Sequence, residues 1–209
     1  MSINIKLVDS DSEIEKKINV AIAEELNLLI KKRNEKAKRQ LRAAINKWIM
    51  AQPEIDSLQS EGVPNTLNSQ FGLLPGEAVV AVTDIVNSVV ESIEVNIKPI
   101  DSRLNGGVDF LIQPSSLRNL LGLPSGFVIS SSGPLHWLSW LLTEGTSTIV
   151  YGFTYTPDIS GRSGGGTMTS GGVWRIPPQY SGVESDNFIT RALLGNDREL
   201  AAILMDIFQ

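Results

Sequence analysis

The chain has 209 residues and a mass of 22.7 kDa, with 42% hydrophobic and 20% charged residues. This composition is typical of a soluble globular protein. The absence of cysteine excludes disulfides, thiolate metal sites and cysteine nucleophiles, and a single histidine leaves few histidine metal sites. No apolar run is long enough to span a bilayer, and the N-terminus lacks a signal-peptide pattern, so we expect a protein that begins in a cytoplasm.

Apolar residues at helical spacing predict one long helix, or two in series, over Asp11–Met50. Ser10 or Ser12 can cap its first amide groups, and Pro53 ends it. The apolar positions are Ile14, Ile18, Ala21, Ile22, Leu26 and Leu29, and then Leu41, Ala44, Ile45 and Trp48. An unbroken helix would be about 60 Å long, at about 1.5 Å per residue. One small domain cannot bury such a length, so we expect the helix to pack against neighbouring subunits.

The middle of this helix is strongly basic. Between Lys31 and Lys47 there are eight basic residues and one acid, Glu35, a net charge of +7, so the rest of the chain carries −12. Because the charges occupy successive positions, we expect them to surround the helix, and no aromatic residue lies among them before Trp48. This pattern favours a helix that faces solvent or an acidic partner, through residues such as Lys32 and Arg39, over a nucleic-acid site.

The rest of the chain mixes helical and strand patterns. Residues 51–76 are expected to form a connector, and Glu77–Glu91 a second helix. Alternation of Ile93, Val95 and Ile97 predicts a strand, which Asn105-Gly106 would turn into a hairpin with "GVDFLIQ". Further elements are a helical turn over Ser116–Leu121, strands in "GFVISS", "STIVYGFTY" and "VWRI", and helices in "PLHWLSWLL", "DNFITRALL" and "DRELAAILMDIF".

These elements predict an α+β fold. A long N-terminal helix and further helices would pack on a small, mainly antiparallel sheet that carries a long glycine-rich loop. We expect residues 1–52 to form the long helical segment and residues 53–209 the α+β domain, together one structural unit.

Residues Gly161–Gly165 match the G-x-S-x-G pattern, which makes Ser163 a candidate nucleophile. A nucleophile elbow needs a strand directly before the serine and a helix directly after it, but Pro157 precedes this loop and three glycines follow the serine. His136 also precedes the serine, the reverse of the α/β-hydrolase order. The lysine of a phosphate-binding loop is missing too. We therefore expect no catalytic role for Ser163, and a serine hydrolase is the alternative to a structural protein.

The single histidine and the carboxylates offer no stronger site. His136 lies beside Trp137 and Trp140 on an expected helix, where we predict a packed or interface imidazole, because no second histidine or cysteine can complete a metal site. Three carboxylates near the end of the second helix could form a cluster, but we expect them to be solvated and assign no acid or base role. They are Asp84, Glu91 and Glu94.

Six of the twelve residues in Gly161–Gly172 are glycine, so ordering this segment would cost much backbone entropy. We expect a mobile surface loop that is ordered only against a neighbouring subunit or ring, with Arg162 and Met168 supplying contacts. Aromatic residues on both sides suggest that the loop extends from a sheet. The expected subunit or partner interface comprises Arg162, Met168, Trp174, Arg175, His136, Trp137, Trp140, Lys32 and Arg39.

Three short motifs occur in the order seen in the head-to-tail joining and tail-completion proteins of tailed bacteriophages. Pro99-Ile100-Asp101-Ser102-Arg103-Leu104 resembles a "Pro-Val-Asp-Thr-Gly-Arg-Leu" stretch that enters a strand, although the glycine after Ser102 is missing. Thr143-Glu144-Gly145-Thr146 is similar to a "Glu-x-Gly-Thr" that ends an aromatic-rich segment. Asn187-Phe188-Ile189-Thr190-Arg191-Ala192 resembles "Pro-Phe-x-x-Pro-Ala", with Asn187 and Arg191 in place of the prolines. The resemblance covers about residues 93–209 and, more loosely, the first helix.

This resemblance implies a structural virion protein, not an enzyme, with no cofactor. Such a protein would form a homo-oligomeric ring, such as a hexamer or dodecamer, in the phage neck or tail end. Its partners would be other neck, portal-adaptor or tail proteins, with DNA only passing through the ring lumen and no membrane. It would be found in the virion, and in the host cytoplasm during assembly. A nucleic-acid-binding module acting through the basic helix over 31–47 is a further alternative.

The motifs make physical sense as assembly elements. Gly145 would end the tryptophan-rich helix in a left-handed conformation. Asp186 would cap the following helix, so that Phe188 enters the core.

Overall fold

The computed structural model describes residues 9–112, 116–130, 133–158 and 160–207. Within these ranges the chain forms an α+β fold, as predicted, with eight α-helices and six strands. In chain order the elements are α1 (Asp11–Met50), α2 (Pro53–Gln59), α3 (Leu67–Phe71), α4 (Glu77–Glu91), β1 (Glu94–Lys98), β2 (Gly107–Leu111), α5 (Arg118–Leu121), the 3-10 helix η1 (Pro124–Gly126), β3 (Val128–Ser130), β4 (Gly133–Leu135), α6 (Trp137–Leu142), β5 (Val150–Pro157), β6 (Gly166–Trp174), α7 (Phe188–Leu194) and α8 (Asp197–Met205).

The strands form three separate antiparallel pairs and not one sheet. β1 pairs with β2 from Glu94 opposite Leu111 to Lys98 opposite Gly107, and β3 pairs with β4. β5 and β6 form a longer ribbon with a bulge between Tyr151 and Phe153. Each pair therefore depends on helices for its burial, because an isolated two-stranded hairpin is marginally stable.

Helix α1 is continuous over its 40 residues, and it begins in the way that the sequence predicts. The Oγ of Ser10 accepts a hydrogen bond from the amide of Glu13 at 3.4 Å, and the Glu13 carboxylate accepts one from the amide of Ser10 at 2.8 Å. This capping box satisfies two amide groups that the helix leaves free, and its hydrogen bonds lower the pKa of Glu13.

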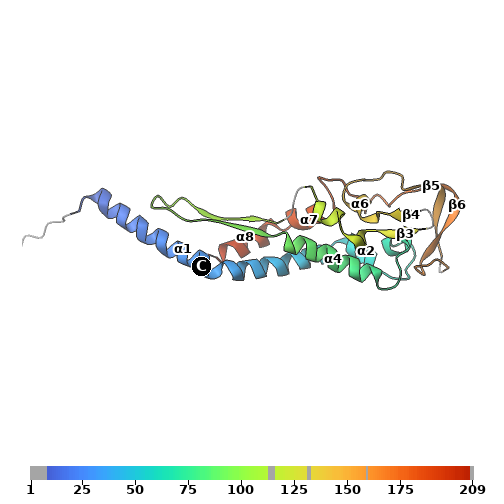
Figure 1. The fold of residues 1–209 in the computed structure, drawn as a ribbon, viewed down its shortest axis with the longest axis horizontal. Coiled ribbons are helices and arrows are strands. Elements are labelled where there is room, and N and C mark those ends of the chain that lie inside the picture. Colours follow the sequence, from blue (N-terminus) through green and yellow to red (C-terminus); the bar gives the residue numbers. More distant parts are fainter. Residues whose placement is uncertain (1–8, 113–115, 131–132, 159, 208–209) are drawn as a thin grey trace, which may run out of the picture.

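A long stalk forms where the hairpin of β1 and β2 and the last helix, α8, lie along α1 (Figure 1). Asn27 on α1 binds the backbone of Ile100 twice, as donor to its carbonyl and as acceptor from its amide, both at 2.9 Å. One helical turn further along, Ile30 is buried with Ala37 and Ile207, against apolar residues of the hairpin. Beyond Asn27, the first turns of α1 extend past the hairpin (Figure 1).

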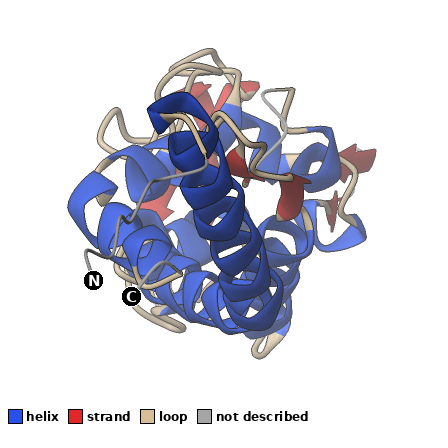
Figure 2. Ribbon diagram, turned by 90° about the vertical axis from the view of Figure 1, so that its left-hand side faces the viewer, coloured by secondary structure: helices blue, strands red, loops and turns tan. Residues whose placement is uncertain are grey.

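The main core forms where the C-terminal half of α1 meets the other helices. Figure 2 looks from the α1 end along the molecule and shows the remaining helices gathered behind it. Fully buried side chains from α1, α2, α4, α6 and α7 meet there, including Ile45, Ile55, Ile85, Leu138 and Phe188. Burying a side chain of this size contributes about 1.5–3 kcal/mol, so this cluster supplies most of the stability of the fold.

One local prediction is wrong and another is right in part. Residues 51–76 do not form a simple connector, because Pro53 opens α2 at a position where its missing amide costs nothing, and Thr66 caps α3. The predicted hairpin of β1 and β2 forms, and Gly106 has the expected positive φ, but Leu104 and not Asn105 takes the left-handed conformation, with φ of 59°. The Asp101 carboxylate fixes that turn by accepting bonds from the amides of Arg103 and Asn105 at 2.8 and 3.0 Å, which lowers the pKa of Asp101.

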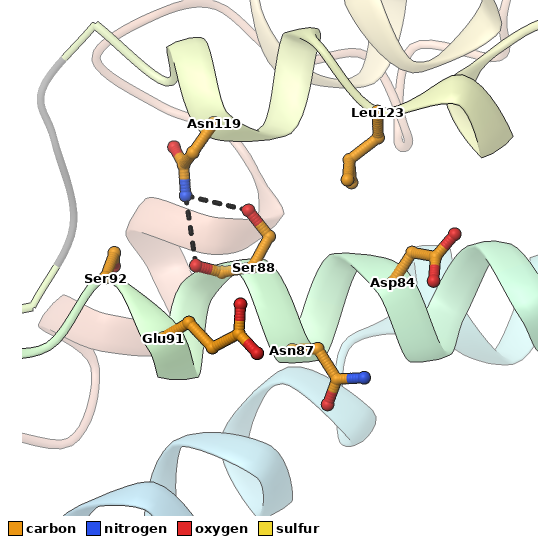
Figure 3. A pocket seen from close by; sticks show the side chains of 7 residues that line it. All are labelled: Asp84, Asn87, Ser88, Glu91, Ser92, Asn119 and Leu123. Carbon is orange, nitrogen blue, oxygen red and sulfur yellow. Dashed lines mark hydrogen bonds between the residues drawn. The ribbon is translucent and has the colours of Figure 1, made fainter.

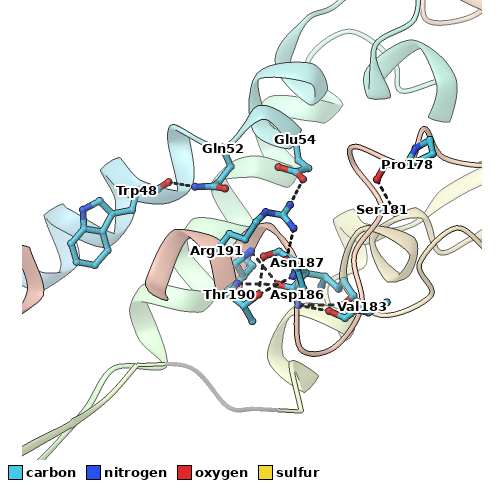
Figure 4. Close-up of polar contacts among 12 residues, drawn as sticks. Trp48, Gln52, Glu54, Pro178, Ser181, Val183, Asp186, Asn187, Thr190 and Arg191 are labelled. Atoms are coloured by element: carbon cyan, nitrogen blue, oxygen red, sulfur yellow. Dashed lines mark hydrogen bonds and ion pairs between the residues drawn. The ribbon is translucent and has the colours of Figure 1, made fainter. Parts of the chain in front are cut away.

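A buried carboxylate joins α2 to α7 (Figure 4). Glu54 is fully buried and forms an ion pair with Arg191, which also donates a bond of 2.8 Å to Asp186. Burial raises the pKa of Glu54 above its ordinary value, and its second oxygen has no hydrogen-bond partner. The Arg191 guanidinium is therefore the group that makes a charge at Glu54 tolerable.

Replacing Arg191 with Met should destabilise the fold at pH 7 by about 2–4 kcal/mol, because Glu54 would lose its cation inside the core. Because the pKa of Glu54 is raised, the folded state favours the protonated carboxyl. The stability that this preference gives is fully present below pH 4.5 and is lost as the pH rises through the raised pKa. The penalty should therefore be smaller at pH 4 than at pH 7. Urea unfolding at both values measures it.

The matched control is the double variant Glu54→Gln/Arg191→Met. It should recover most of the loss at pH 7, because no charge then remains in the buried position. An Arg191→Met penalty that is equal at the two pH values, or that persists in the double variant, would show that Glu54 is not the reason for it.

Candidate functional site

The glycine-rich segment is packed against the body of the protein and does not form a free loop. Its second half, from Gly166, belongs to strand β6, and its first half lies on α3. A Cβ at Gly165 would be 2.5 Å from the Ser69 Cβ and 2.8 Å from the Val63 carbonyl oxygen. The hydroxyl of Tyr155 lies 2.8 Å from both the Gly165 carbonyl oxygen and the Ser69 Oγ.

The prediction of a mobile loop over Gly161–Gly172 is thus wrong for this chain. Backbone freedom is used at Gly164, Gly171 and Gly172, which have positive φ, whereas at Gly161 and Gly165 glycine allows two backbones to approach more closely than a side chain would permit. The segment is ordered by its own chain, so no neighbouring subunit is needed to order it.

Replacing Gly165 with Ala should destabilise the fold by about 1–3 kcal/mol, because the added methyl group overlaps α3. Gly122→Ala is the control, since Gly122 has an ordinary φ of −86° and the nearest atom would lie 3.3 Å from the new Cβ. Thermal unfolding of both variants measures the difference. Equal melting temperatures would mean that the glycine segment does not pack on α3.

Ser163 lies inside this packed segment. It is 6% exposed, and its Oγ donates a bond of 3.3 Å to the backbone carbonyl of Ser69, not to His136. No strand ends directly before it and no helix follows it, so the expected absence of a nucleophile elbow is confirmed. His136 stacks on Phe127, with ring centroids 4.1 Å apart, and burial lowers its pKa. The geometry assigns no shared chemistry to these two residues.

Several residues expected at a subunit interface contact their own chain instead. Trp137 and Trp174 are buried and pack on Phe71, so they belong to the core and cannot face a subunit. Arg162 is held at its own chain, since it donates to the Ile129 carbonyl at 3.1 Å and lies 3.8 Å from the Glu77 carboxylate. Aromatic residues occupy both core positions and exposed positions in this chain. The residue type alone therefore does not distinguish a core residue from an interface residue.

The remaining expected interface residues are partly or fully exposed. Trp140 is half-buried and donates to the Ser147 hydroxyl at 3.1 Å. Met168 is exposed on the ribbon of β5 and β6, where Tyr151 and Phe153 are also exposed. Arg175 follows β6, donates to the Thr148 hydroxyl at 3.1 Å, and lines a groove of about 540 Å³. This end of the molecule offers apolar contact surface and no group of reactive side chains.

The three family-like motifs lie in turns and caps. Asp101 organises the hairpin turn, and Gly106 lies so close to Pro99 that a Cβ would be 2.7 Å from its carbonyl oxygen. Pro99, Arg103, Glu144 and Thr146 are exposed. Gly145 takes a left-handed φ of 60°, as predicted, but it follows the end of α6 by three residues.

The third motif caps α7. Asn187, not Asp186, is the N-cap, and its side-chain oxygen accepts bonds from the amides of Ile189 and Thr190, both at 3.1 Å. Asp186 instead binds Arg191. The cap carries Phe188 and Ala192 into the core, where both are fully buried. The predicted role of the motif is therefore confirmed, with a different capping residue.

A polar cavity of about 480 Å³ lies beside α4 (Figure 3). Asp84 and Glu91 line it from two turns apart, and Asn119 closes one side by donating to the carbonyl and hydroxyl of Ser88 at 3.2 and 2.9 Å. Glu94, expected in the same cluster, is not among the lining residues. No group of three or more histidine, cysteine or acidic side chains in the described parts of the chain could hold a metal ion.

The basic residues of α1 cover the sides of the helix that are not buried. The buried side of the helix carries Ile30 and Ala37, and Lys32 and Arg39 follow these by two positions, about 200° around the helix. At about 100° per residue the eight cations span about 220° of the circumference, so the charges surround the helix except on its buried side. Three of the eight cations contact α8 and the residues after it: Arg33, Lys36 and Lys47. The other five take part in no ion pair within the described ranges: Lys31, Lys32, Lys38, Arg39 and Arg42.

We call residues Asp11–Leu29 of α1 the arm. Ile18 lies nine residues, or about two and a half turns, before Asn27, so it is on the side of α1 that faces away from the hairpin. Ile18, Ile22 and Leu28 are 53%, 41% and 62% exposed. The arm therefore has one apolar side that its own chain covers, at Ala23, and a second, with Ile18, Ile22 and Leu28, that the described residues leave exposed.

Comparisons with protein-family models, with curated proteins and with solved structures find no match for the chain. In the part of the chain that the structure describes, no helix combines the length and the apolar character that crossing a membrane would need.

Proposed function

We propose that this protein is a structural subunit of a ring in the neck or tail end of a tailed bacteriophage, where it joins head to tail or completes the tail. The observation that carries the proposal is the arm, whose apolar side chains from Ile18 to Leu28 are exposed along about 15 Å of helix. Large exposed apolar side chains in a row are typical of a protein interface. The role proposed is therefore assembly, not catalysis.

The motif order supports the same proposal. The residues similar to the family motifs, including Asp101, Gly145 and Asn187, hold turns and a helix cap, as parts of an assembly scaffold would. None of these three residues lines either of the cavities described above. In the proposed ring DNA passes through the lumen, the partners are portal-adaptor and tail proteins, and no cofactor is required.

A serine hydrolase, the alternative, has less support. Ser163 is 6% exposed and its hydroxyl donates to a backbone carbonyl, an arrangement that favours a structural role over that of an activated nucleophile. Ser163→Ala should therefore leave assembly of the protein unchanged. Loss of assembly in this variant without loss of thermal stability would reopen a specific role for the hydroxyl.

The proposed function predicts that the purified chain forms closed rings, alone or together with its neck neighbours. Light scattering at several protein concentrations should give a mass that is a fixed multiple of 22.7 kDa. Negative-stain imaging should show particles with a central passage. In virions of the phage that encodes the chain, antibodies against it should label the junction of head and tail.

A chain that stays monomeric in both settings would contradict the ring. If rings form in solution but the chain is absent from purified virions, the proposed ring stands and the proposed location in the phage neck is wrong. These two measurements are independent, so either part of the proposal can fail alone.

A further inference from the structure

We infer that the arm of one copy docks on the basic side of α1 in a neighbouring copy, so that a single helix carries both halves of the contact between subunits. This inference rests on the proposed function for the ring but names the surface that builds it. The two halves are the arm, Asp11–Leu29, and the basic face, which we define as the unpaired cations Lys31, Lys32, Lys38, Arg39 and Arg42.

The arm has the chemistry of one partner. It carries five acidic and two basic residues, a net charge of −3, and all five acids are exposed. Ile14, Ile18 and Ile22 are spaced at single turns and form an apolar row, with Leu28 beside it. An apolar row with acidic flanks requires a surface that is both positively charged and able to cover methyl groups.

The basic face has the chemistry of the other partner. Its five cations have no ion-pair partner within the described ranges, whereas Lys36 and Lys47 on the same helix are bound by Asp206 and Glu199. Lysine and arginine side chains present long aliphatic stems beneath their charges, and these stems cover apolar surface while the charged ends meet carboxylates. The basic face can therefore bind the arm through both kinds of contact.

A second copy of the chain supplies the partner at the required length. The arm spans about five turns and the basic face, from Lys31 to Arg42, about three turns of one uninterrupted helix, and their centres are about 16 residues, or about 25 Å, apart. Two parallel helices offset by that distance bring arm and basic face together and leave one arm and one face free at the ends. Such a head-to-tail contact closes into a ring when the rotation between copies permits.

Antiparallel pairing would satisfy the same charges within a closed dimer. The two arrangements differ in particle mass, so the contact and the ring can be tested separately. DNA is the other ligand that a basic face could bind, through its phosphates, but DNA would leave the apolar row of the arm uncovered.

The experiment reverses the charges of each half. One variant carries Glu15→Lys, Glu24→Lys and Glu25→Lys, and the other carries Lys32→Glu, Arg39→Glu and Arg42→Glu. All six side chains are exposed, and none takes part in an ion pair or side-chain hydrogen bond described above. Each variant alone should need a protein concentration at least about tenfold higher for assembly, because attraction becomes repulsion at three positions.

Mixing the two variants in equal amounts should restore assembly, and so should a chain with all six reversals, because the charges are again complementary. A control chain with Asp56→Lys, Glu184→Lys and Asp197→Lys changes the net charge by the same amount as the arm variant, but outside α1, and should assemble as the unmodified chain does. Circular dichroism and thermal unfolding verify that every variant is folded.

The result that overturns the inference is assembly of each singly reversed variant at the original concentration, or failure of the mixture and of the sixfold variant while both remain folded. If the unmodified chain stays monomeric and the Lys32, Arg39 and Arg42 variant loses binding to a 30-base-pair duplex, the basic face binds nucleic acid instead. If the mixture rule holds but the particles are dimers, the contact stands and the proposed ring fails. If rings form regardless of these charges, the ring stands and this contact fails.

Discussion

Helix α1 is longer than the body of the protein that can bury it, and this mismatch determines how the other elements are arranged. Its C-terminal half, with Leu41, Ile45 and Trp48, is the centre of the core, and helices pack around it because burial of their apolar sides is the main favourable term in folding. Within the described ranges its middle is covered by a hairpin and by the last residues before position 208. No other described element covers its first turns at Ile18 and Ile22, which are exposed.

The polar residues along α1 are placed to match this change from core to solvent. Near the core, the Trp48 indole donates to Glu199 at 2.9 Å, a bond that lowers the pKa of this carboxyl. Further out, Asn27 replaces apolar packing with two hydrogen bonds to the backbone of Ile100. Directed polar contacts therefore add to burial at both places, next to the core at Trp48 and next to the arm at Asn27.

The long helices could be predicted from the sequence because their signals are local. α1 begins after Ser10, which supplies a capping oxygen. α4 begins after Gly76 and ends before Ser92, where the helical pattern of apolar residues is interrupted. The short helices α2 and α3 could not be predicted in this way. Their sequences are rich in Pro, Asn and Ser, and they are helical because burial of Ile55, Leu67 and Phe71 stabilises them.

The positions of some candidate site residues likewise follow from local sequence, and those of others depend on residues far away in the chain. The exposed position of Lys32 and Arg39 follows from the spacing of Ile30 and Ala37, because one helix fixes both. Whether Trp174 faces the core or a partner depends on Phe71, about a hundred residues earlier in the chain, and no local pattern carries that information. The same is true of Gly165, whose role is set by the distance to Ser69 and not by its neighbours in sequence.

One mechanical property follows from the continuity of α1. No proline or glycine interrupts its 40 residues, and the helix changes direction between the arm and its core half without a break (Figure 1). The arm, about 28 Å long, acts as a lever on the part of α1 that the body holds: a tilt of about 5° where the arm begins moves its tip by about 2.5 Å. A small change in how α1 packs on the body is thereby converted into a larger displacement at a point far from where the change occurs.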